Sequence, residues 1–97
     1  MKNIVAIDVG NSETTVGVGN HSSWRSYRYT TRKTITSDEL FMMFKTTIDP
    51  NSINDENLDG SIICSVVPQI TESVVEATER FTSKKVYTVG PGIKTGL

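Results

Sequence analysis

The sequence contains one cysteine, no long hydrophobic run and almost no net charge, and each shortage excludes a class of protein. A single cysteine cannot form an internal disulfide, which excludes a small disulfide-stabilised domain. No apolar segment approaches the roughly 20 residues that cross a bilayer, and the first residues lack the pattern of a signal peptide. The formal net charge of -1 gives no electrostatic reason to bind nucleic acid or a membrane. We therefore expect one small cytoplasmic domain that binds neither nucleic acid nor a membrane.

The one cysteine, Cys64, lies in the apolar run 60–67. We expect it to be a buried small hydrophobic residue in a strand, because free cysteines are among the most buried residue types. A strand interior is also a poor place to activate a thiol, so no catalytic role is expected for it.

Hydrophobic periodicity predicts three strands at the start of the chain. Residues 3–9 are β-branched and almost continuously apolar, which indicates a strand buried on both faces at the centre of a sheet. Residues 14–19 alternate polar and apolar positions, and a tight turn at Gly19 and Asn20 leads to a third strand at 24–31. Three consecutive strands with short turns make an antiparallel meander.

Two helices and two further strands are expected after the meander. Thr36 or Ser37 can cap a helix that ends before Asp49 and Pro50. The remaining expected elements are a surface loop at 50–59, a second buried strand at 60–67, a helix beginning at Pro68 and a last strand at 84–89.

This order of elements predicts an α/β fold. A meander extended by strands that arrive through right-handed helical crossovers gives a mixed five-stranded sheet with two helices on its faces. It is the order of the ribonuclease H-like half-domain, the building block of the actin, heat-shock-protein-70 and sugar-kinase superfamily. Fold alone does not choose among the functions of that superfamily.

The stretch 8–12, Asp-Val-Gly-Asn-Ser, stands where the first strand ends. An aspartate at the carboxyl end of a central strand points into the crevice where α/β sheets bind ligands, and it can hold a hydrated divalent ion. Gly10 lets backbone N–H groups surround phosphate oxygens, and Ser12, Thr14 and Thr15 can add hydroxyl donors. Asp-x-Gly-Asn is equally a good turn sequence without any ligand, so both interpretations stay open.

Three segments together resemble the type III pantothenate kinases, whose relatives include the Bvg accessory factor proteins. They are Ala-Ile-Asp-Val-Gly-Asn-Ser at 6–12, Ile-Ile-Cys-Ser-Val-Val-Pro at 62–68 and Val-Gly-Pro-Gly-Ile-Lys-Thr-Gly-Leu at 89–97. The resemblance implies an enzyme that phosphorylates pantothenate with ATP to 4'-phosphopantothenate, the first step of coenzyme A biosynthesis. It also implies Mg2+, a monovalent cation (K+ or NH4+) and a homodimeric complete protein.

By position, the resemblance implies a phosphate loop that binds the phosphates of ATP and in which Asp8 organises the metal. The phosphate loop consists of Asp8, Val9, Gly10, Asn11, Ser12, Glu13, Thr14 and Thr15. Gly90 and Gly92 belong to a glycine-rich segment that is either a wall beside the substrate or a flexible linker. In the family a Gly-Ala-Asp-Arg segment with the general base follows, and then a second half-domain. We therefore expect residues 1–97 to be the amino-terminal lobe of a two-lobe kinase, with no catalytic residue of its own and little turnover alone.

Two other functions stay open beside the kinase. Glu13 stands where the family often has asparagine, and together with the missing base it favours a non-catalytic interaction or regulatory module of the same fold. A ribonuclease H-type nuclease needs several acidic residues around two metals, and only Asp8 stands at such a position.

Overall fold

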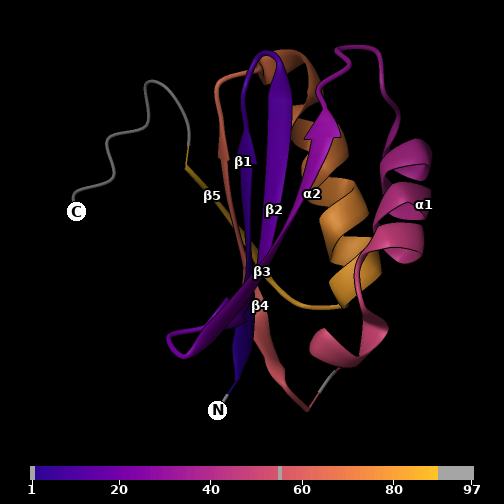
Figure 1. Cartoon of the computed structure of the whole chain (residues 1–97). Coiled ribbons are helices and arrows are strands. Elements are labelled where there is room, and N and C mark those ends of the chain that lie inside the picture. Colours follow the sequence, from indigo (N-terminus) through magenta and orange to yellow (C-terminus); the bar gives the residue numbers. More distant parts are fainter. Residues whose placement is uncertain (1, 55, 90–97) are drawn as a thin grey trace.

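The chain folds around one five-stranded sheet (Figure 1), and the structure, a computed structural model, describes residues 2–54 and 56–89. Its elements are β1 (Asn3–Val9), β2 (Glu13–Asn20), β3 (Ser23–Thr30), α1 (Ser37–Thr47), the 3-10 helix η1 (Pro50–Ser52), β4 (Leu58–Ser65), α2 (Pro68–Thr82) and β5 (Val86–Val89). The predicted order of strands and helices is confirmed. None of the helices in the described ranges is long and apolar enough to cross a membrane.

The central strand is β1, and its two neighbours make the sheet mixed. The strand order is β3-β2-β1-β4-β5. β2 pairs antiparallel with both β1 and β3, which confirms the meander, whereas β4 pairs parallel with β1 and β5 pairs parallel with β4. Because parallel neighbours require crossover connections, the chain passes through α1 before β4 and through α2 before β5. The carboxyl ends of β1, β4 and β5 therefore lie at the same edge of the sheet.

Both helices pack against the same face of the sheet (Figure 1) and against each other. The two crossovers move in the same direction across the sheet, and right-handed crossovers in one direction lie on one face. Between the helices and the sheet lies the hydrophobic core, whose largest fully buried side chains include Phe44, Leu58 and Ile63. The opposite side of the sheet is covered by no described element, and we name it the open face.

The expectation that β1 and β4 are buried on both faces is wrong for the described part of the chain. Along β1, Val5 and Ile7 point into the core, whereas Ile4 and Asp8 are exposed. β4 alternates in the same way. An apolar run is compatible with burial on one side or on two, so it did not reveal that both helices cover one face.

Cys64 is exposed, which corrects the expectation of a buried cysteine. It stands between Ile63 and Ser65, which point into the core, so the alternation of β4 directs its side chain to the open face. Met42 of α1 is 56% exposed, so it does not fill space in the core.

Two local expectations also need correction. The turn between β2 and β3 is formed by His21 and Ser22 rather than by Gly19 and Asn20, because Asn20 already pairs with Ser23. The segment 50–59 is not a plain surface loop: it contains η1, Ile53 packs into the core, and β4 begins at the fully buried Leu58.

Helix α1 begins with a complete capping box. The Thr36 hydroxyl accepts a hydrogen bond from the backbone N–H of Glu39 (3.2 Å), and the Glu39 carboxylate accepts one from the backbone N–H of Thr36 (3.0 Å). Each of these bonds satisfies a donor that the start of the helix leaves without a partner. The predicted alternatives for the cap are thus resolved in favour of Thr36.

Replacing Thr36 by alanine is expected to lower the free energy of unfolding by about 1 kcal/mol, because the Glu39 N–H loses its acceptor. Hydrogen bonds from Thr36 also hold the pKa of Glu39 below its ordinary value. A carboxyl with a lowered pKa in the folded state adds stability above its unfolded pKa, and this contribution is lost as the pH falls through the folded pKa. Urea unfolding at neutral and at acidic pH therefore measures both effects, and the variant should lose less stability on acidification.

Thr34→Ala is the matched control, since Thr34 is an exposed threonine just before the cap. We expect it to change the free energy of unfolding by less than about 0.5 kcal/mol. Equal losses in the two variants would contradict the assigned cap.

Candidate functional site

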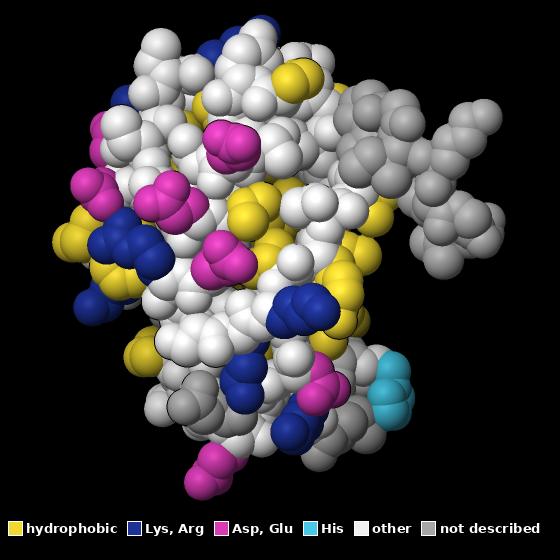
Figure 2. Space-filling model, turned by 180° about the vertical axis from the view of Figure 1, so that it is seen from behind, with side chains coloured by type: hydrophobic (Ala, Val, Ile, Leu, Met, Phe, Trp, Pro, Cys, Tyr) yellow, Lys and Arg dark blue, Asp and Glu magenta, His cyan; other side chains and the backbone are white. Residues whose placement is uncertain are grey.

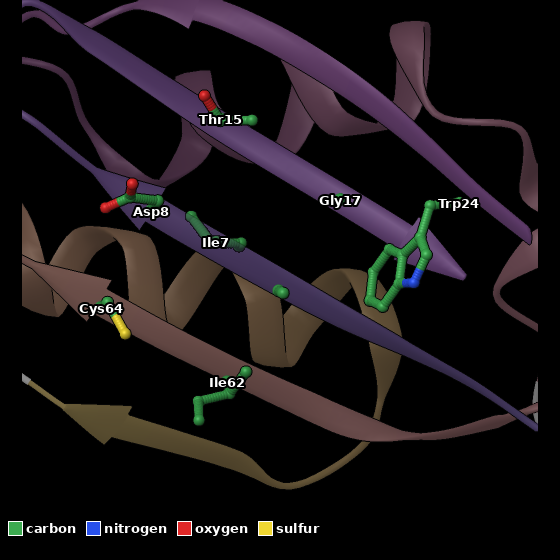
Figure 3. A pocket seen from close by; sticks show the side chains of 8 residues that line it. Ile7, Asp8, Thr15, Gly17, Trp24, Ile62 and Cys64 are labelled. Atoms are coloured by element: carbon green, nitrogen blue, oxygen red, sulfur yellow. The ribbon is translucent and has the colours of Figure 1, made fainter. Parts of the chain in front are cut away.

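A depression of about 540 Å³ lies on the open face, over the middle and the carboxyl end of β1 (Figure 3). Its lining residues come from four neighbouring strands: Ala6, Ile7, Asp8, Thr15, Gly17, Trp24, Ile62 and Cys64. Polar groups stand at one end of the depression and apolar side chains fill the rest. The polar end coincides with the edge of the sheet at which α/β folds bind ligands.

Asp8 is the charged residue of this depression. It pairs with Thr15 of β2 on one side and with Cys64 of β4 on the other, so all three side chains point to the open face (Figure 3). The Asp8 side chain is exposed, and within the described ranges no side chain or backbone group forms a hydrogen bond or ion pair with its carboxylate. Its negative charge is therefore available to a ligand.

The hairpin after β1 is held in place by the backbone on both sides. The Gly10 N–H donates to the Glu13 carbonyl (3.0 Å), and the Thr31 N–H donates to the Ser12 carbonyl (3.0 Å). A Cβ atom at residue 10 would stand 3.0 Å from the Glu13 carbonyl oxygen, which is a tight contact, so the hairpin itself favours glycine at this position. The turn explanation of this motif is thus supported, and it is compatible with phosphate binding because Asn11 and Ser12 are exposed at the tip.

The structure brings some of the predicted phosphate-loop side chains together and separates others. Asp8 and Thr15 share the open face, whereas Val9 and Thr14 point to the helix-covered side. Thr14 is buried, and its hydroxyl hydrogen-bonds with that of Thr31 (2.8 Å). Val9 and Thr14 can therefore contribute only backbone groups to a phosphate site.

Glu13 opens β2 beside the exposed hairpin tip. Its carboxylate lies 3.8 Å from Arg28 of β3, and both side chains are more than half exposed. The positive charge of Arg28 partly compensates the negative charge of Glu13, which would otherwise repel a phosphate bound at the hairpin tip. The two other residues proposed for the site, Gly90 and Gly92, lie outside the described residues.

The apolar part of the depression was not predicted from the sequence. Trp24 lies over Gly17, where a Cβ atom would stand 3.3 Å from two indole carbons. Ala6 pairs with both Gly17 and Ile62, which places these three residues in one row across the sheet. The signal that could have found them is the period of two, since Ile62 and Cys64 alternate with the buried Ser61 and Ile63.

The donor groups fit a hydrated Mg2+ that is completed by phosphate oxygens. Within the described residues, no group of three or more acidic, histidine or cysteine side chains could hold a metal by itself. Magnesium commonly keeps several waters and binds through one or two carboxylates together with substrate phosphates. The available carboxylate of Asp8 and the neighbouring Thr15 hydroxyl suit this mode, and no all-protein cage is needed for it.

Solved structures share the fold at low sequence identity. YeaZ from Pseudomonas aeruginosa matches with a TM-score of 0.63 at 11% identity, covering 93% of this chain and 44% of that chain. RuvC of T. thermophilus, solved in complex with a Holliday junction substrate, matches with a TM-score of 0.57 at 14% identity, covering 94% of this chain and 66% of that chain. These similarities support the predicted ribonuclease H-like and actin-like fold class, and nothing about function.

The sequence comparisons identify the family. Curated proteins called type III pantothenate kinase match 97% of this chain, at 40% identity in Listeria innocua, 37% in Agathobacter rectalis and 34% in an Exiguobacterium species. The chain spans only 36–37% of the length of these relatives. The sequence profile described as type III pantothenate kinase matches residues 4–97, which leaves only the first three residues outside it. On this match, the chain belongs to the type III pantothenate kinase family.

Proposed function

We propose that this chain supplies the part of a type III pantothenate kinase that binds the ATP phosphates and Mg2+. The reaction transfers the γ-phosphate of ATP to the primary hydroxyl of pantothenate and gives 4'-phosphopantothenate, the first step toward coenzyme A. The observation that carries the proposal is the position of Asp8 at the carboxyl end of β1, beside the exposed hairpin tip and with its carboxylate available. Membership of the family, over residues 4–97, supports the substrate assignment.

Each group of the site has a specific task in this proposal. The carboxylate of Asp8 holds the hydrated metal, since direct contact between a carboxylate and phosphate would be repulsive. Backbone N–H groups of Asn11 and Ser12 donate to phosphate oxygens, and the Thr15 hydroxyl orients water or phosphate next to Asp8. Bound Mg2+ supplies neutralisation of the negative charge on the phosphates. The Gly10 position admits phosphate because no side chain stands there.

The attacking alcohol must also lose a proton, and a positioned base accepts it. We propose that the base comes from outside these residues, so that residues 1–97 form one lobe of a two-lobe kinase and turn over little substrate alone. The same proposal includes K+ or NH4+ as an activating cation, a homodimeric complete protein in the cytoplasm, and Gly90 and Gly92 near pantothenate.

A chimeric enzyme tests the proposal without requiring activity of this chain alone. Residues 1–97 of this chain replace the matched segment of the Listeria innocua relative, which is 40% identical over 95 residues. Formation of 4'-phosphopantothenate from ATP and pantothenate is measured with Mg2+ and K+ present. We expect turnover by the chimera and little or none by the 97-residue chain. A folded chimera that neither binds ATP nor phosphorylates pantothenate would contradict the proposal.

The second candidate is a non-catalytic interaction or regulatory module, and Glu13 is the observation that favours it. Its carboxylate lies beside the hairpin tip that is proposed to bind phosphate. The negative charge of Glu13 repels phosphate unless the positive charge of Arg28 compensates it. A chimera that binds ATP but forms no product would support this alternative. A Glu13→Asn chimera separates the two, because recovered turnover would show that Glu13 alone limits the chemistry.

A further inference from the structure

We propose that Arg28 of β3 binds the phosphates of ATP, and that Glu13 holds the Arg28 side chain in place while no nucleotide is bound. This inference rests on the proposed kinase function, and it adds to the site a cation that lies outside the phosphate loop. It also gives a task to Glu13, whose negative charge is otherwise unfavourable beside phosphate.

Arg28 lies in one row of residues with Asp8 across the sheet. Arg28 pairs with Thr15 of β2, and Thr15 pairs with Asp8 of β1. Residues directly opposite each other on neighbouring strands point to the same face of a sheet. The Arg28 side chain therefore leaves the open face beside the polar end of the depression, where Figure 3 shows Asp8 and Thr15.

The spacing of this row suits a metal-bound phosphate. Two strand spacings of about 4.8 Å each separate Arg28 from Asp8, with only the small Thr15 side chain between them. Magnesium lies about 2.1 Å from each of its oxygen ligands. The row thus has room for a metal ion and a phosphate group between the Asp8 carboxylate and the Arg28 guanidinium.

The contact between Arg28 and Glu13 is loose enough to be exchanged for a ligand. Nε of Arg28 lies 3.8 Å from Oε1 of Glu13, which is beyond hydrogen-bond distance, and the two side chains are 74% and 56% exposed. Within residues 2–54 and 56–89, Arg28 forms no other ion pair. Exposed ion pairs contribute little to stability, so a triphosphate with several negative charges competes well for the guanidinium.

Arginine is well suited to phosphate at this position. The guanidinium is planar and always charged, and it donates two parallel hydrogen bonds to phosphate oxygens. From β3 it neutralises phosphate charge on the side away from Asp8. Glu13 loses its partner in this state, but its carboxylate is more than half exposed and stays hydrated at little cost.

The charge on the opposite side of the molecule also favours the open face for a triphosphate. Figure 2, which shows the molecule from behind, has acidic side chains in the middle of the view. The depression between α2 and β5 is lined by three glutamates, Glu72, Glu76 and Glu79. These carboxylates repel phosphate, whereas Arg28 attracts it to the side of the sheet that carries Asp8.

The test measures ATP binding to the chimeric kinase by calorimetry, with Mg2+ present. The variants are Arg28→Gln, Glu13→Gln and the double variant. We expect Arg28→Gln to raise the dissociation constant of ATP about tenfold or more, because charge-assisted hydrogen bonds to phosphate are lost. The KM for pantothenate should change less than about twofold, since the lost contact is with the phosphates. Glu13→Gln should tighten ATP binding, because it removes a repulsive charge and releases Arg28.

The double variant separates phosphate binding from simple compensation of Glu13. If Arg28 only compensated the charge of Glu13, Arg28→Gln would have no effect in the Glu13→Gln background. If Arg28 binds phosphate, Arg28→Gln weakens ATP binding about tenfold in that background as well.

Arg25→Gln is the matched control, since Arg25 is an exposed arginine of the same strand. It pairs with the buried Val18, so its side chain lies on the helix-covered side, away from Asp8. We expect this variant to bind ATP within about twofold of the unmodified chimera.

Two results would overturn the role of Arg28 and leave the kinase function standing. The first is an active chimera in which Arg28→Gln binds ATP as tightly as Arg25→Gln. The second is a loss of affinity that occurs only while Glu13 is present. A folded, unmodified chimera that binds no ATP would contradict the kinase function, and the role of Arg28 with it.

Discussion

Replacing Asp8 by asparagine is expected to lower kcat/KM of the chimeric kinase by at least about a hundredfold, which corresponds to about 2.7 kcal/mol of transition-state stabilisation. Asparagine keeps the size of the side chain but removes the negative charge that is proposed to hold the hydrated Mg2+. Because the Asp8 carboxylate has no hydrogen-bond or ion-pair partner in the described residues, the substitution should change the free energy of unfolding very little. The measurements are product formation over a range of Mg2+ concentrations and urea unfolding of the variant.

Asp59→Asn is the matched control for this prediction. Asp59 is also an exposed aspartate of an inner strand, but it lies near the amino end of β4, where its carboxylate is 3.9 Å from the Lys2 ammonium. We expect this variant to retain nearly the full kcat/KM, since a surface ion pair contributes at most about 1 kcal/mol to stability. If Asp8→Asn and Asp59→Asn had equal activities, Asp8 would have no role with the metal.

Replacing Phe44 by alanine is expected to lower the free energy of unfolding by about 3–5 kcal/mol, the largest stability effect that we predict. Phe44 of α1 is 1% exposed and contacts two other rings, with centroid distances of 6.0 Å to Tyr29 and 5.8 Å to Phe81. It therefore joins α1 to β3 and to α2. A domain of this size has a total stability of about 5–15 kcal/mol, so the variant loses a large part of it.

Urea unfolding followed by circular dichroism measures this loss, and Met42→Ala on the same helix is the control. Both variants shorten a large apolar side chain in α1, but Met42 is 56% exposed, so its removal leaves no cavity. We expect less than about 0.5 kcal/mol for Met42→Ala. A loss below about 1 kcal/mol for Phe44→Ala would contradict the assigned packing of α1 on the sheet.

The elements with strong local signals were predicted correctly. Thr36, one of the two predicted candidates, caps α1, Pro68 opens α2, and α1 ends before Asp49 and Pro50, because each of these features depends on a few neighbouring residues. The antiparallel meander and the central position of the first strand were also predicted, since short turns and right-handed crossovers leave few alternatives. Asp8 was placed at the end of the central strand for the same reason.

The environment of Cys64 and Ile62 was not predicted, because their burial depends on what covers the second face of the sheet. The sequence of an apolar strand has the same pattern whether helices cover one face of the sheet or both. Thr14 illustrates a related limit of sequence analysis, because Thr14 and Thr15 were both predicted to offer hydroxyl groups to phosphate. Pairing with Val9 directs the Thr14 side chain to the helix side, away from Asp8.

The sequence by itself determined the order of the elements, the family and the position of Asp8 after the first strand, since these depend on local pattern and on motif spacing. Only the tertiary structure decided that both helices share one face, that Trp24 covers Gly17, and that Asp8, Thr15 and Cys64 stand side by side. The physical reason is that register and layer are set by hydrogen bonds and packing between residues far apart in the chain, and a local pattern carries no record of them.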